Sequence, residues 1–134
     1  MKGSQVDLEN RFLELMKGPF FVVILFKIDS YQTFKQKHDE KTSSLTQFSI
    51  CYIAEELSGM EAVVIDKDEI GLLCQLEKKV YPVDLYNVIT EIQKSIVKLY
   101  DFTLSVGIGP IVDSKGEIRN SYRYAKENIT SRFF

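Results

Sequence analysis

Two apolar segments lie so close together in this sequence that only one way of pairing them in a sheet is open. Glu61–Ile65 and Ile70–Leu76 are rich in aliphatic residues, and only the polar residues Asp66–Glu69 separate them. A parallel pair of strands requires a crossover of about a dozen residues or more. The two segments therefore predict an antiparallel hairpin, which argues against a doubly wound parallel sheet.

The elements around this hairpin predict an α+β fold. Phe20–Phe26 is an unbroken apolar run that is too short for a typical helix, so it predicts a central strand buried on both faces. The resulting order β-α-α-β-β-α-β-α predicts a ferredoxin-like antiparallel sheet with packed helices. The other predicted elements are helices at Tyr31–His38, Thr42–Leu57 and Pro82–Leu99, a strand at Phe102–Gly109, and a last helix after Ser114.

Capping residues predict where the helices begin, and helical periodicity predicts which side of each helix is buried. Ser30 is a predicted N-cap, Pro82 suits a first helical turn, and Ser114 with Glu117 forms a predicted capping box. The inward residues are predicted to be Ile50, Ile53, Ala54 and Leu57; Leu85, Val88, Ile89, Ile92, Ile96 and Leu99; and Ile118, Tyr122, Ala125 and Ile129.

Composition excludes several classes of function. The 134 residues suit one domain, 45% of them are hydrophobic, and the net charge of −2 comes without any basic block, so we expect no contact with nucleic acid. The longest apolar run is seven residues and the start of the chain lacks an apolar signal stretch, so we expect neither a membrane span nor export. Cys51 and Cys74 fit no paired motif and predict buried, reduced thiols in a cytoplasmic protein.

Most catalytic patterns are missing. The only histidine, His38, lies in a charged stretch and is predicted to be a solvated residue rather than part of a triad. The glycines of Gly107-Ile108-Gly109 are predicted to allow a close helix approach or a bulge. An EF-hand spacing that begins at Asp66 is broken by Ile70, which offers no side-chain oxygen.

One arrangement does suggest phosphoryl chemistry in outline. Carboxylates from adjacent strands can hold Mg²⁺ against a triphosphate. Here a strand that ends in Lys27-Ile28-Asp29 is predicted beside a hairpin tip that carries Asp68 and Glu69.

These stretches resemble the GGDEF domains, whose active members condense two GTP molecules into cyclic di-GMP. Phe26–Phe34 resembles their first strand and following helix, Asp66–Ile70 falls where the signature hairpin belongs, and Leu104–Gly109 resembles their Ser-Ile-Gly strand. The working residues depart from that family's pattern. Lys27 stands at the metal-binding Asp, and Asp66 and Lys67 stand at the glycine pair that approaches the nucleotide. Asp68 and Glu69 keep the signature acids, but Glu69 alone remains of the metal ligands, since Asp29 matches a non-ligating Asp. The resemblance therefore implies a degenerate site without catalytic residues, metal or cofactor.

A closer resemblance is to the degenerate GGDEF-like domain of AraC-type, YesN-like response regulators, carried by Asn10–Gly18 and Ser121–Ile129 as well. It implies a linker helix at residues 1–18 and a degenerate GGDEF-like domain at 19–134, within a larger cytoplasmic, bacterial two-component regulator. Its partners would be a receiver and a DNA-binding helix-turn-helix part of the same chain, and a homodimer is compatible with it. The expected role is non-enzymatic coupling between those parts. The alternatives are a nucleotide- or metabolite-sensing domain and an active diguanylate or nucleotidyl cyclase.

Lys27 carries the sharpest expectation about the site. Because it stands in place of a carboxylate, we expect its ammonium group to act as an internal cation. Its Nζ is predicted to lie within about 4 Å of an oxygen of Asp68, Glu69 or Asp29.

Overall fold

The computed structural model describes residues 19–129 and contains one four-stranded antiparallel sheet with the strand order β2-β3-β1-β4. The strands are β1 (Phe20–Ile28), β2 (Glu61–Asp66), β3 (Glu69–Leu76) and β4 (Leu104–Ile108). The predicted fold class and element order are confirmed. The predicted linker helix at residues 1–18 lies outside the described residues, as do residues 130–134.

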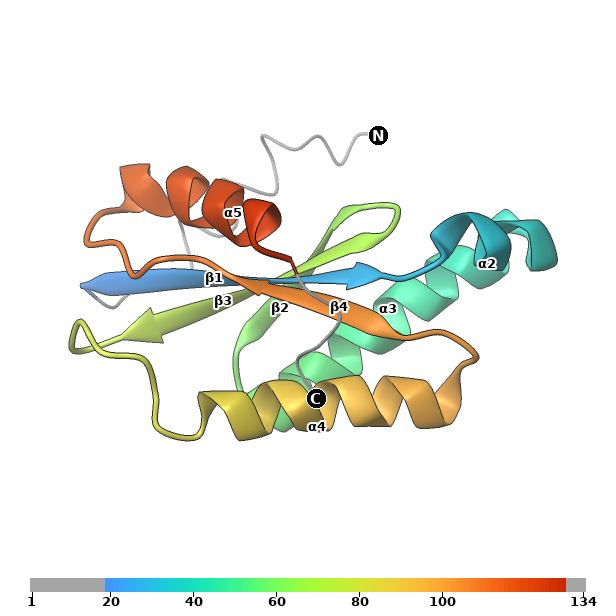
Figure 1. Cartoon of the computed structure of the whole chain (residues 1–134), viewed down its shortest axis with the longest axis horizontal. Helices are drawn as coiled ribbons and strands as arrows, with labels where there is room; N and C mark the ends of the chain where they lie inside the picture. Colours follow the sequence, from blue (N-terminus) through green and yellow to red (C-terminus); the bar gives the residue numbers. More distant parts are fainter. Residues whose placement is uncertain (1–18, 130–134) are drawn as a thin grey trace.

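Helices cover both faces of the sheet. The helices α2 (Tyr31–Lys37), α3 (Glu40–Ser58) and α4 (Leu85–Leu99) enclose the larger core, while α5 (Ile118–Glu127) packs on the opposite face (Figure 1). Along β1, Ile24, Phe26 and Ile28 enter the larger core, whereas Phe21 and Val23 pack toward α5. Because successive residues of a strand point to opposite faces, β1 needs apolar side chains throughout, as its sequence predicted.

The α5 helix approaches β4 unusually closely, and two glycines make this possible. A Cβ at Gly107 would lie 1.9 Å from the carbonyl oxygen of Ala125, and one at Gly109 would lie 2.1 Å from that of Ser121. The fully buried Ser121 hydroxyl accepts a hydrogen bond from Val23 N at 3.0 Å and donates one to Pro110 O at 2.8 Å. The predicted reason for the two glycines, close approach of a helix, is confirmed.

Several predicted boundaries and caps were wrong. Pro82 precedes α4 rather than forming its first turn, and its carbonyl accepts a hydrogen bond from Leu85 N. Ser114 makes no side-chain cap, because a short 3₁₀ turn at Lys115–Glu117 precedes α5. Ser30 does occupy the N-cap position of α2, as predicted, although its side chain makes no capping hydrogen bond.

Two residues predicted to be buried lie in solvent instead. Leu57 is 42% exposed and Leu99 is 63% exposed. Each lies in the last turn of its helix, where the periodic stripe extends past the residues that cover it. By contrast, Ile50, Ala54, Ile89, Ile92 and Ile96 are fully buried, as predicted.

The two cysteines are both free and buried, which confirms the prediction from their spacing. Burial raises the pKa of the Cys51 thiol to about 12 and that of Cys74 to about 11. Within residues 19–129, no helix combines the length and the apolar character that crossing a bilayer requires.

Candidate functional site

The strand register brings the predicted site residues to one end of the sheet. Lys27 of β1 pairs with Glu69 of β3 on one side and with Ser105 of β4 on the other. Residues directly opposite each other in antiparallel strands share a face, so all three side chains lie on the α5 side. The hairpin tip is held there because Ile28 N donates a hydrogen bond to Asp68 O at 2.8 Å.

Glu69 is the buried acid of this site, with 4% of its surface exposed. The Tyr122 hydroxyl donates a hydrogen bond to its Oε1 at 2.8 Å, and Lys126 Nζ lies 3.2 Å from its Oε2. We call these three residues the Glu69 cluster. A buried carboxylate is costly unless it is paired and hydrogen-bonded, and here α5 supplies both partners.

The contacts within the Glu69 cluster raise the pKa values of two of its side chains. The hydrogen bond to Glu69 and the negative charge of that carboxylate raise the pKa of Lys126. Burial, followed by the hydrogen bond to Glu69, raises the pKa of Tyr122. Both shifts favour the protonated side chains that Glu69 requires as donors.

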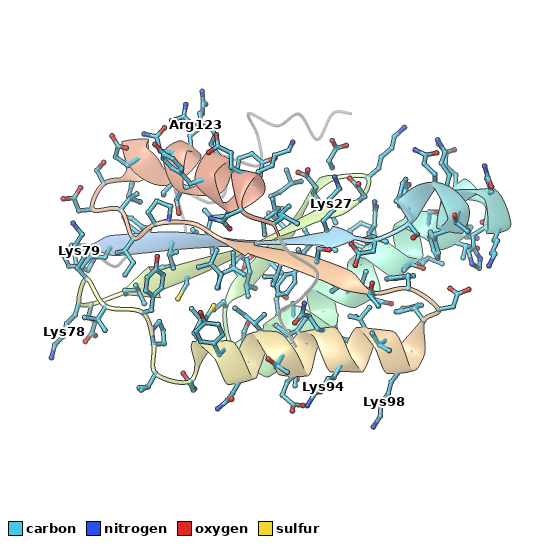
Figure 2. All side chains as sticks on the ribbon, in the orientation of Figure 1. Lys27, Lys78, Lys79, Lys94, Lys98 and Arg123 are labelled. Carbon is cyan, nitrogen blue, oxygen red and sulfur yellow. The ribbon has the colours of Figure 1, made fainter. Side chains whose placement is uncertain are left out.

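Lys27 makes the expected ion pair, but at the rim of the site. Its Nζ lies 3.9 Å from Asp68 Oδ2, so the predicted distance is confirmed, and Figure 2 shows Lys27 beside the β2–β3 hairpin. The Lys27 side chain is 45% exposed and that of Asp68 is 25% exposed. The cation that neutralises the buried acid is therefore Lys126, which sequence reasoning missed.

A sequence signal for Lys126 did exist. Tyr122 was predicted to face inward, and Lys126 follows it by four residues, so the two lie on the same side of α5. The pairing with Glu69 could not be predicted, because it depends on where α5 crosses the sheet.

The carboxylate of Asp29, which follows β1, is bound by residues at the start of β4 and does not face an open site. Its carboxylate accepts hydrogen bonds from Thr103 Oγ1 at 2.5 Å and from Ser105 Oγ, and its backbone N–H donates to Thr103 O. The next residue, Ser30, has a φ of 56° and a ψ of 39°. This left-handed conformation is uncommon for a residue other than glycine, so the chain is strained where it leaves β1.

Asp66 and Lys67 form the exposed part of the hairpin. The Asp66 carboxylate accepts a hydrogen bond from Lys67 N at 2.7 Å, and the Lys67 carbonyl accepts one from the Gln47 side chain of α3. The loop itself is shorter than predicted, because Asp66, the last residue of β2, pairs with Glu69, the first residue of β3. The side chains of Asp66 and Lys67 thus occupy the turn where the GGDEF signature has a pair of glycines.

The acids of the site do not fit a bound magnesium ion. Glu69 and Asp29 each have both carboxylate oxygens engaged by protein groups, and Asp68 lies beside Lys27. No group of three His, Cys, Asp or Glu residues within the described part of the chain is arranged to hold a metal ion. The ammonium groups of Lys27 and Lys126 lie within 4 Å of Asp68 and Glu69, and their charge opposes a divalent cation there.

The strand order, the helices on both faces and the acidic hairpin beside the end of β1 define a nucleotidyl-cyclase-like fold. The family model described as "GGDEF-like domain" matches residues 11–129, and the chain belongs to this family. The chain has no significant match among curated protein sequences.

Solved structures share this fold at low sequence identity. The FimX GGDEF domain from Pseudomonas aeruginosa has a TM-score of 0.66 at 13% identity, covering 91% of this chain and 83% of that one. The GGDEF domain of DgcB from Caulobacter crescentus, solved with c-di-GMP, has a TM-score of 0.63 at 11% identity, with coverages of 92% and 78%. The active GGEEF domain of a diguanylate cyclase from Vibrio cholerae has a TM-score of 0.59 at 7% identity, with coverages of 93% and 85%.

Proposed function

We propose that this chain is a non-catalytic regulatory domain of a bacterial AraC-type transcription regulator. In this role it couples a receiver or sensor part to a C-terminal helix-turn-helix part. The observation that carries the non-catalytic half of the proposal is the Glu69 cluster. The one metal-ligand position that the sequence keeps is buried and neutralised by α5.

Two further features support the absence of turnover. Lys27 stands at the position of a metal-binding Asp, and its charge opposes a divalent cation. Asp66 and Lys67 replace the glycine pair, so side chains and a carboxylate meet any triphosphate that approaches the hairpin.

The non-catalytic half of the proposal is tested by incubating the purified chain with GTP and Mg²⁺ or Mn²⁺ and measuring cyclic di-GMP by chromatography. The active GGEEF domain from Vibrio cholerae serves as the positive control. We expect no product above the level without protein. Formation of cyclic di-GMP that depends on the metal ion would overturn the proposal.

The regulator half is tested by the parent gene. We expect a receiver or sensor sequence before residue 1 and a helix-turn-helix sequence after residue 134. A free-standing reading frame of this domain would overturn this half and leave the non-catalytic half standing.

The domain itself is proposed not to contact DNA. Its net charge is −2, and its most basic stretch, Lys115–Lys126, has four basic residues spread among Glu117, Asn120, Tyr122 and Tyr124. A gel-shift assay with duplex DNA should show no binding that weakens with salt.

A further inference from the structure

The outward face of α3 is more apolar than a solvated helix face needs to be. Leu45, Phe48 and Tyr52 follow one another at helical spacing and are 58%, 66% and 65% exposed. The opposite, buried stripe of the same helix includes the small or polar residues Ser43, Thr46 and Ala54. A helix with apolar residues on both sides is one that packs on two sides.

This face borders an open groove of about 560 Å³ between α3 and the end of α4. The groove is lined by Leu45, Phe48, Ser49, Tyr52, Ile53, Leu99 and Tyr100. Its walls are mainly apolar, and Leu99 is 63% exposed. Contiguous exposed apolar surface rimmed by polar residues is typical of a protein contact site.

The charges at the two ends of the α3 face are complementary under a two-fold rotation. An axis between Phe48 and Ser49 places Leu45 of one copy opposite Tyr52 of the other. The same axis places the exposed Lys41 opposite the exposed Glu56 at both ends of the contact. An antiparallel arrangement also sets the two helix dipoles in opposite directions.

We propose that the outward face of α3 is a self-complementary interface through which two copies of this chain form an antiparallel dimer. Phe48 and Tyr52 of each copy enter the α3–α4 groove of the other, and Lys41 pairs with Glu56 across each end. This inference does not depend on the regulator context or on the absence of turnover.

The area of the outward α3 face sets the expected affinity of the dimer. Aromatic side chains bury about 150–250 Å² each when fully covered. The exposed parts of Phe48, Tyr52, Leu45 and Leu99 therefore supply roughly half of the ~800 Å² per partner that standard interfaces bury. The remainder must come from the polar rim. We therefore expect a reversible dimer in the micromolar range.

The test is sedimentation equilibrium of the full 134-residue chain across micromolar concentrations. The natural sequence should show a concentration-dependent dimer. Phe48→Glu should weaken it at least about tenfold, because it buries a charge in the centre of the contact. Val83→Glu is the matched control, because Val83 is fully exposed on the loop before α4 and should leave the dimer unchanged. Circular dichroism confirms that both variants are folded.

A charge reversal tests the antiparallel arrangement. Lys41→Glu and Glu56→Lys should each weaken the dimer by about three- to tenfold, since each sets like charges together at both ends. The double variant should recover the affinity of the natural sequence. A chain that stays monomeric, a dimer insensitive to Phe48→Glu, or a double variant without recovery would each overturn the proposal.

Discussion

Replacing Lys126 by Met removes the cation from the Glu69 cluster while keeping a side chain of similar length. Glu69, which is 4% exposed in the natural chain, keeps the Tyr122 hydroxyl as its donor but loses the ammonium group that lies 3.2 Å from Oε2. Breaking a fully buried ion pair costs about 3–5 kcal/mol. Because the Lys126 side chain is 52% exposed, solvent screens the pair, and we expect a smaller loss of about 1–2 kcal/mol.

The assay is thermal unfolding followed by circular dichroism at neutral pH. For a domain of this size the expected loss lowers the melting temperature by roughly 3–8 °C. Lys94→Met is the control, because Lys94 is an exposed lysine on α4 (Figure 2), and its replacement should change little. In a double variant, Glu69→Gln should recover most of the stability lost in Lys126→Met, because the amide still accepts from Tyr122 and carries no charge.

The pH dependence gives a second measure of the same pair. The pKa of Lys126 is raised in the folded state, so its stabilisation is complete below the pKa of the unfolded lysine and is lost as pH rises through the folded value. The melting temperatures of the natural chain and of Lys126→Met should therefore converge as the pH rises above the ordinary lysine pKa and through the raised pKa of Lys126. An unchanged melting temperature in Lys126→Met, or no recovery with Glu69→Gln, would refute the reasoning.

Three other predictions concern residues outside the Glu69 cluster. Lys27→Asp should cost only about 0.5–1 kcal/mol in chemical denaturation, because the pair is half-exposed, and millimolar Mg²⁺ should not restore it; recovery with Mg²⁺ would mean that the acids can still bind a metal. Gly107→Ala should cost about 3 kcal/mol or more, because its Cβ meets the α5 backbone, whereas Gly116→Ala enters open space and should be neutral in the same melting assay. Cys51 and Cys74, which are buried with pKa values of about 12 and about 11, should react with a thiol reagent only at the rate of unfolding; fast labelling of the folded chain would show that this core opens.

Local features of the sequence were enough to predict the fold. The short gap between the hairpin strands imposes antiparallel pairing, and the unbroken apolar run of β1 requires cover on both faces. The period of α4 identified its buried residues because the helix repeat and the core face stay in phase over four turns.

The ends of the elements were less predictable. Leu57 and Leu99 continue the periodic stripes but are exposed, because periodicity gives the direction of a side chain and not whether anything lies above it. Ser114 and Glu117 have the spacing of a capping box, yet a 3₁₀ turn separates Ser114 from α5. Such outcomes depend on how neighbouring elements pack.

The candidate site was likewise predictable only in part. The sequence by itself determined that acids and Lys27 would meet at the hairpin, since these residues lie at the ends of neighbouring strands. Only the tertiary structure decided that the buried acid is Glu69 and that its cation comes from α5. That choice follows from Gly107, whose missing side chain lets α5 approach β4 closely enough for Lys126 to reach Glu69.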